Sequence, residues 1–171
     1  MAITVSDSGG GNFTPHPVGL HQMVCCDVID NGLCETAYGP KRKVTVRWES
    51  QELTDKGQRM TVQQRYTASL NEKARLRHDL ESWRGKAFTG DELAAFDLEK
   101  LIGVNCMVNV VQRADAKGKL WANPASLAPL MRGLEKMAVS QDYVRQSDRE
   151  PEPNETAQHD GGEVNADSIP F

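Results

Sequence analysis

Basic side chains alternate with apolar ones in two neighbouring segments of the sequence, residues 41–49 and 59–68. This alternation is typical of strands with one buried face, and the polar loop 51–57 between the segments predicts a hairpin. The face opposite the apolar one carries the positive charge, from Lys41 at its end and from Lys43, Arg47, Arg59 and Arg65. A row of cations suits the phosphate backbone of a single nucleic-acid strand. The alternative is an ordinary charged exterior of a sheet.

Binding of a single strand also needs flat side chains on which bases can stack. Trp121 is the candidate, with Lys119 beside it as a further phosphate contact, although core packing of Trp121 remains an equal alternative. Trp48 and Tyr66 share the apolar face of the expected hairpin, so we expect both in the core. Trp83 lies on the apolar stripe of an expected helix and is assigned to the core as well.

Cysteine and histidine residues offer a second kind of chemistry, a zinc site. The chain has Cys25, Cys26, Cys34 and Cys106, but no pair with the tight spacing of structural zinc ligands. Adjacent residues of a strand, such as Cys25 and Cys26, point to opposite faces. Phosphate-loop, zinc-protease, serine-nucleophile and dinucleotide motifs do not occur in the sequence either. We therefore expect no metal, no cofactor and no enzymatic activity.

The elements that position these residues follow from periodicity and capping signals. A strand over Val18–Ile29 should end at a turn over residues 30–32, and the hairpin follows it. Capping boxes at Ser69/Glu72 and Thr89/Glu92 begin helical segments, the first of which ends at Gly85. Two strands close the pattern, over Val104–Val111 and Leu120–Leu130, the latter weakened by Pro124.

Three strands, a helical insert and two strands are the element order of an OB-fold, a five-stranded Greek-key barrel in a mainly β protein. A five-stranded α+β sandwich has a similar set of elements and is the alternative fold.

The distribution of charge divides the chain into two parts. Residues 1–130 carry 16 Lys+Arg and 15 Asp+Glu, whereas residues 131–171 carry 4 and 9. We expect a flexible arm over 1–16, one domain over 17–130, and a linker with a disordered acidic tail over 131–171.

Neither a membrane-spanning run nor a signal-peptide pattern is present, which predicts a cytoplasmic protein. The sequence leaves the oligomeric state open, a homo-oligomer included.

The last residues, Asp167-Ser168-Ile169-Pro170-Phe171, resemble the C-terminal tip of bacterial single-stranded DNA-binding proteins. In that family the tip docks on partner proteins, so the resemblance assigns partner recruitment to Asp167, Ile169, Pro170 and Phe171. Ser168 stands where the family usually has an acid. An apolar pocket rimmed by basic residues would accept such a tip.

The body resembles a group of bacteriophage proteins with an OB-type barrel. The resemblance lies in the run Arg65-Tyr66-Thr67-x-Ser69-Leu70 and in Asp79-Leu80-Glu81-x-Trp83-Arg84-Gly85-x-x-Phe88. Both resemblances imply non-sequence-specific binding of single-stranded DNA during phage replication or recombination, in the cytoplasm of a bacterial host. The alternative is an adaptor of the replication machinery whose barrel binds protein instead of DNA.

Overall fold

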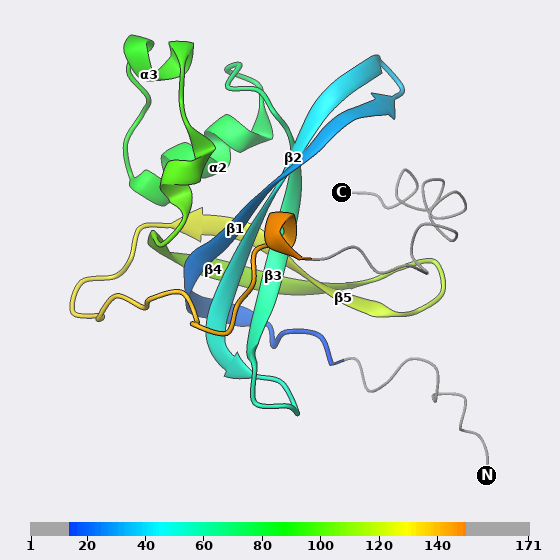
Figure 1. Ribbon diagram of the computed structural model, residues 1–171, viewed down its shortest axis with the longest axis vertical. Coiled ribbons are helices and arrows are strands. Elements are labelled where there is room, and N and C mark those ends of the chain that lie inside the picture. The colour runs from blue at the N-terminus through cyan, green and yellow to red at the C-terminus, as the bar shows by residue number, and fades with distance from the viewer. Residues whose placement is uncertain (1–13, 150–171) are drawn as a thin grey trace.

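One antiparallel sheet of five strands forms the body of the protein, with few helices, in the computed structural model, which describes residues 14–149 (Figure 1). The strand order in the sheet is β3-β2-β1-β4-β5. The strands are β1 (Gly19–Thr36), β2 (Gly39–Leu53), β3 (Arg59–Thr67), β4 (Asn105–Ala114) and β5 (Leu120–Ala128). Within residues 14–149, no helix is long and apolar enough to cross a membrane.

The alternation predicted for β2 and β3 is confirmed, and it places the core. Val44, Val46 and Trp48 of β2 are buried on the same side as Val62 and Tyr66 of β3. Helix α2 (Arg75–Arg84) adds Leu76, Leu80 and Trp83 to this core, and the rings of Trp48 and Trp83 lie 5.7 Å apart. The core assignments of Trp48, Tyr66 and Trp83 are therefore also confirmed.

Strand β1 is longer than predicted, because the turn expected at residues 30–32 is a bulge instead. The pairing with β2 shifts by one residue between Asp30 and Gly32, and the strand continues to Thr36. Gly32 adopts the left-handed region at φ +70°, and its N–H donates to the Asp30 side chain. Glycine tolerates this conformation at no steric cost, so the local turn signal was absorbed within the strand. The β1–β2 hairpin consequently projects beyond the rest of the sheet (Figure 1).

A second bulge in β1 changes the direction of one side chain. Cys25 pairs with Trp48 and lies in the core, whereas Asp27 pairs with Arg47, so Cys26 is the extra residue. Residues two apart on a regular strand point to the same face. The bulge therefore turns Asp27 away from the core and toward the outer face of the sheet, beside Arg47.

The insert between β3 and β4 differs from prediction at its first cap. Helix α2 begins after Ala74 with no side-chain cap, and the predicted Ser69/Glu72 capping box is wrong. Ser69 and Asn71 instead accept hydrogen bonds from backbone N–H groups two residues ahead, a local turn that competes with helix initiation. The predicted end at Gly85 (φ 74°) is confirmed. The Thr89/Glu92 capping box is confirmed at α3 (Gly90–Ala94), and a 3-10 helix, η1 (Leu98–Leu101), follows.

Strands β4 and β5 form the last hairpin, close to the predicted bounds. Asp115 orders its turn by accepting hydrogen bonds from the N–H groups of Lys117 and Lys119. Pro124 lies in β5, the last strand in the order of the sheet, and the register of β4 and β5 shifts by one residue near it. Proline donates no ladder hydrogen bond, which explains its place on an edge strand next to an irregularity.

The packed part of the chain extends past residue 130, where the sequence placed the end of the domain. Residues 137–149, here called the strap, run across the outer face of the sheet and include the 3-10 helix η2 (Gln146–Asp148) (Figure 1). Asn105 holds the first residue of the strap, because its side chain exchanges two hydrogen bonds with the backbone of Met137. At the other end of the chain, His16 is buried and bonded to Ser50, inside the expected arm. Residues 1–13 and 150–171 lie outside the described part.

Asp27 anchors the far end of the strap. Its carboxylate is fully buried and accepts hydrogen bonds from the Tyr143 hydroxyl (3.0 Å), the Arg145 guanidinium (3.1 Å) and the Gln146 N–H (2.8 Å). Arg145 also bridges to Glu99, and so ties the strap to η1. Burial alone would raise the pKa of the Asp27 carboxyl, but these hydrogen bonds hold it below the ordinary value of 3.8. A buried charge is tolerated only with such partners.

We expect Asp27→Asn to lower the free energy of unfolding by about 1–3 kcal/mol, because three donors lose a charged acceptor. Since folding depresses the pKa of Asp27, this stabilisation is present above pH 3.8 and is lost as pH falls through the folded value. Urea titrations of both proteins across pH measure the difference. Asp55→Asn is the control, because Asp55 is exposed and within residues 14–149 its side chain has no hydrogen bond or ion pair. Equal effects of the two substitutions would contradict the anchoring role.

Candidate nucleic-acid interface

Two hollows follow one another along β3. The first, called the cleft, has a volume of about 720 Å³ and is lined by Arg59–Gln63 of β3, by residues of β2 and β5, and by the strap. The second, called the groove, has a volume of about 1010 Å³. It is lined by residues 64–67 of β3, by the end of the β1–β2 hairpin and by the loop before α2. Strand β3 thus lines the cleft as far as Gln63 and the groove from Gln64 onward.

Six of the seven residues predicted to bind DNA line these hollows. Arg47, Arg59 and Trp121 line the cleft. Lys41, Lys43 and Arg65 line the groove. The seventh, Lys119, places its amino group 4.5 Å from the centre of the Trp121 ring. The structure therefore brings the predicted residues together in two groups, not on one uninterrupted basic face.

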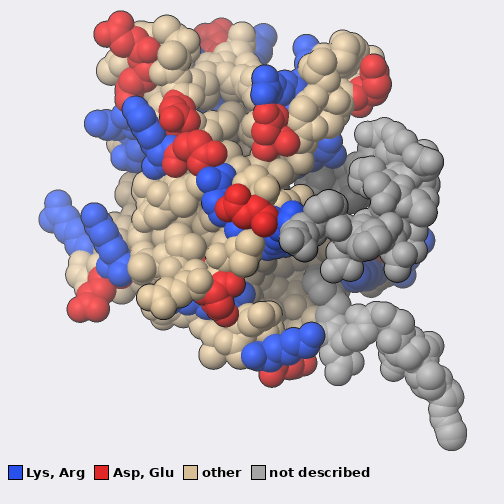
Figure 2. All heavy atoms as spheres, viewed as in Figure 1, with Lys and Arg blue, Asp and Glu red and all other residues tan. Residues whose placement is uncertain are grey.

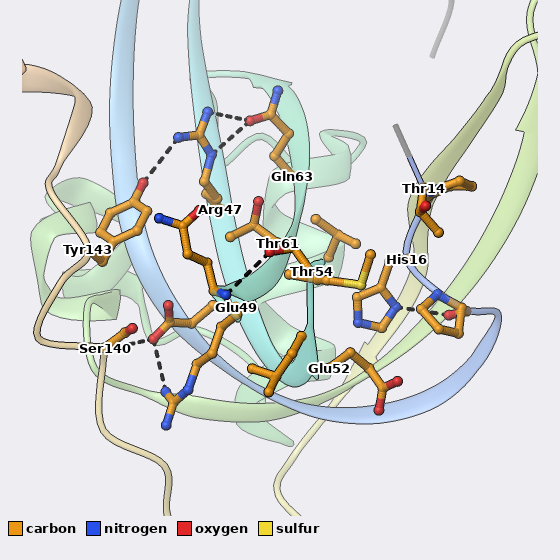
Figure 3. Close-up of a pocket in the computed structure, with 18 of the residues that line it drawn as sticks. Thr14, His16, Arg47, Glu49, Glu52, Thr54, Thr61, Gln63, Ser140 and Tyr143 are labelled. Atoms are coloured by element: carbon orange, nitrogen blue, oxygen red, sulfur yellow. Dashed lines mark hydrogen bonds and ion pairs between the residues drawn. The ribbon is translucent and has the colours of Figure 1, made fainter. Parts of the chain in front are cut away.

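Arg47 is held in place on the wall of the cleft (Figure 3). Its Nε and Nη2 donate to the side-chain oxygen of Gln63 at 2.9 and 2.6 Å. Its Nη1 donates to the Tyr143 hydroxyl at 3.1 Å, and Gln146 accepts a longer bond. These partners are neutral, so none of them compensates the positive charge of Arg47, but the strap restricts access to it.

Arg59 forms an ion pair with a buried acid, Glu49, which the sequence analysis did not predict. Glu49 is almost fully buried on the outer side of β2, and its carboxylate pairs with Arg59 at 3.0 Å. The Ser140 N–H donates to the same oxygen (Figure 3). Arg59 also donates to the Ala138 carbonyl. Arg59 therefore connects β3 to the strap, and its role is structural as well as electrostatic.

Trp121 is a partly exposed aromatic residue that lines the cleft. The residue is 43% exposed, and its indole N–H donates to Asp115 at 2.8 Å. This hydrogen bond, with those from the turn, lowers the pKa of the Asp115 carboxyl. The ring is thus fixed between Asp115 and the Lys119 amino group while one part stays open to solvent. The core alternative for Trp121 does not hold.

Two cations of the groove have neutral hydrogen-bond partners. Lys43 donates to the Thr67 hydroxyl at 2.7 Å, and Arg65 donates to the Cys34 thiol at 2.9 Å. Lys73 and Arg75, from the loop before α2 and its first turn, also line it. The sequence analysis missed these two. Basic residues just after a predicted basic strand were a signal for them, but only the fold shows on which side of β3 they lie.

Charge is distributed unequally between the hollows. The cleft has three arginines (Arg47, Arg59 and Arg149) against four acids (Glu49, Glu52, Asp55 and Asp142). Among residues 14–149, the groove has five cations and one acid, Glu35. Elsewhere, acidic and basic side chains are interspersed over the face shown in Figure 2. The net charge of the chain therefore says little about the groove.

No family model matches the sequence, and no curated protein matches it. Among residues 14–149, no group of three or more His, Cys, Asp or Glu side chains could hold a metal ion. The tip residues Asp167, Ile169, Pro170 and Phe171 lie outside the described part of the chain, so their predicted role stays a prediction.

We expect Arg59→Ala to lower the free energy of unfolding by about 1–3 kcal/mol, because it leaves the buried Glu49 carboxylate without its cation. Arg113→Ala is the control, since Arg113 is exposed at the end of β4 and should change stability by less than about 0.5 kcal/mol. Chemical denaturation measures both. If Arg59→Ala leaves the free energy of unfolding unchanged, the ion pair with Glu49 contributes nothing to the stability of the fold.

Proposed function

We propose that this protein binds single-stranded DNA without sequence preference, with the strand following β3 from the groove to the cleft. The observation that supports the proposal is the position of the predicted DNA-binding residues around the cleft and the groove. Six of the seven residues predicted from the sequence for phosphate contact and stacking line two hollows that follow one another along β3. A backbone-tracking cationic surface beside an aromatic side chain is the requirement for such binding.

We further propose that the sheet is an OB-type barrel. Its support is the strand order β3-β2-β1-β4-β5 together with a helix between β3 and β4. Closure of such a barrel brings β3 and β5 together, and residues of both strands line the cleft. OB-folds bind oligonucleotides on the face of strands 2 and 3, flanked by the β1–β2 and β4–β5 loops. The groove lies at the first loop and Trp121 at the second.

The length of β3 sets the scale of the binding site. Its nine residues span about 30 Å at roughly 3.3 Å per residue. A single OB-fold covers about 4–16 nucleotides, and a short segment of strand fits this length. The proposed role is protection of single strands during phage replication or recombination, with partner recruitment through residues 167–171.

Trp121 and Trp48 provide a matched pair of substitutions that tests the proposal. We expect Trp121→Ala to weaken binding of an oligo(dT) by about 1–3 kcal/mol with little loss of stability, because a stacking surface is removed. Trp48→Ala should instead lower the free energy of unfolding by about 3–5 kcal/mol, because Trp48 is fully buried. Fluorescence anisotropy with labelled oligo(dT) and chemical denaturation measure the two effects.

The wild-type protein in the same anisotropy experiment decides the function itself. Failure to bind oligo(dT) at low salt would refute strand binding and favour the adaptor. If the wild type binds but Trp121→Ala retains full affinity, bases do not stack on Trp121 and the β5 side of the path is wrong.

A further inference from the structure

The two hollows along β3 differ in the kind of nucleic-acid atom that they suit. The groove is rich in cations with little acidic compensation, whereas the cleft has more acids than cations. A phosphate is attracted to the first and repelled by the second, because exposed charges interact within a Debye length of about 8–10 Å. One uniform track of phosphate contacts therefore does not fit the structure.

The cations of the groove are able to accept a new anion. Lys41 and Lys73 are exposed, and within residues 14–149 neither amino group has a hydrogen bond or an ion pair. Lys43 and Arg65 bond to the neutral hydroxyl of Thr67 and thiol of Cys34. Arg75 is the exception, because it pairs with Asp79 at 3.4 Å. Phosphate binding in the groove would thus break no strong ion pair except that of Arg75.

Two cations of the cleft already interact with other groups of the protein. Arg59 forms an ion pair with buried Glu49, and Arg47 donates hydrogen bonds to Gln63 and to the strap. The exposed acids Glu52, Asp55 and Asp142 add negative charge around them. What the cleft offers to a ligand is the partly exposed Trp121 ring and neutral hydrogen-bonding side chains, such as those of Thr61 and Gln63 (Figure 3). These groups suit the faces and edges of bases.

We propose that the groove is a phosphate clamp that does not contact bases, and that the cleft receives bases and few phosphates. This inference rests on the proposed function and divides its site into two parts. The clamp is formed mainly by Lys41, Lys43, Arg65 and Lys73. Phosphates held there fix the strand beside the β1–β2 hairpin, while the next nucleotides turn their bases toward Trp121.

An abasic oligonucleotide separates the two parts, because it keeps every phosphate and lacks every base. The experiment measures affinity for oligo(dT) and for an abasic oligonucleotide of equal length, as a function of salt. The variants are Lys41→Gln/Lys73→Gln in the groove and Trp121→Ala in the cleft. The control is Lys100→Gln/Lys136→Gln, which removes the same charge from exposed lysines outside both hollows.

The groove variant should lose affinity by the same factor for both ligands. Its plot of log affinity against log salt should become less steep by about 1.4 on each, because single strands give a slope of roughly −0.7 per phosphate contact. Trp121→Ala should lower the affinity for oligo(dT) roughly 5- to 150-fold and leave its salt slope unchanged. Its affinity for the abasic oligonucleotide should stay the same. The control variant should change neither slope by more than a small fraction.

Two results would overturn the clamp while leaving strand binding intact. One is a control variant that flattens the slope as much as the groove variant, which would make the effect one of general charge. The other is a groove variant that loses affinity for oligo(dT) but not for the abasic ligand, which would place bases in the groove. Wild-type protein that binds neither ligand refutes the proposed function itself, so the two failures are distinguishable.

Discussion

The outer face of the sheet depends on one buried carboxylate. Asp27 accepts hydrogen bonds from Tyr143, Arg145 and Gln146, and so fixes the strap across β1 and β2. Without this anchor the strap would keep only one contact with a buried carboxylate among residues 14–149, that with Glu49 on the same face, and Arg47 would lose its Tyr143 partner. The bulge at Cys26 makes the anchor geometrically available, because it rotates Asp27 from the core side to the strap side.

The strap also determines which cations can serve a ligand. It engages Arg47 through Tyr143 and Arg59 through Ala138, and it shields the Glu49 carboxylate from water. Arg47 and Arg59, both predicted from the sequence to contact phosphate, therefore hold the strap against the sheet. The cations of the groove lie beyond its reach, on the hairpin and on the loop before α2. Positive charge available to a ligand is thus concentrated at one end of β3.

Much of the sheet and its core could be predicted from the sequence, because alternation in β2 and β3 is a local signal. The residues Val44, Val46, Trp48, Val62 and Tyr66 were assigned correctly to the core for that reason. The strap was missed because its contacts are not local: Arg145 lies 118 residues from Asp27. A signal for it existed, since an acid within the apolar run of β1 needs a partner, but the partner's identity is a property of the fold. The predicted end of the first strand at residues 30–32 was wrong, because a turn-forming sequence also occurs as a bulge within a continuous strand.

The three tryptophans occupy two contrasting environments, which gives the protein a built-in optical probe. Trp48 and Trp83 are enclosed in the core with their rings 5.7 Å apart, and Trp121 lies at the surface under a lysine amino group. From these exposures we expect a water-soluble quencher such as iodide to reach Trp121 and not the other two. The quenchable part of the intrinsic emission therefore belongs to a single indole at the mouth of the cleft, and the protected part reports on the integrity of the core. Unfolding of the chain and a change in the surroundings of Trp121 should therefore give separate signals in one unlabelled sample.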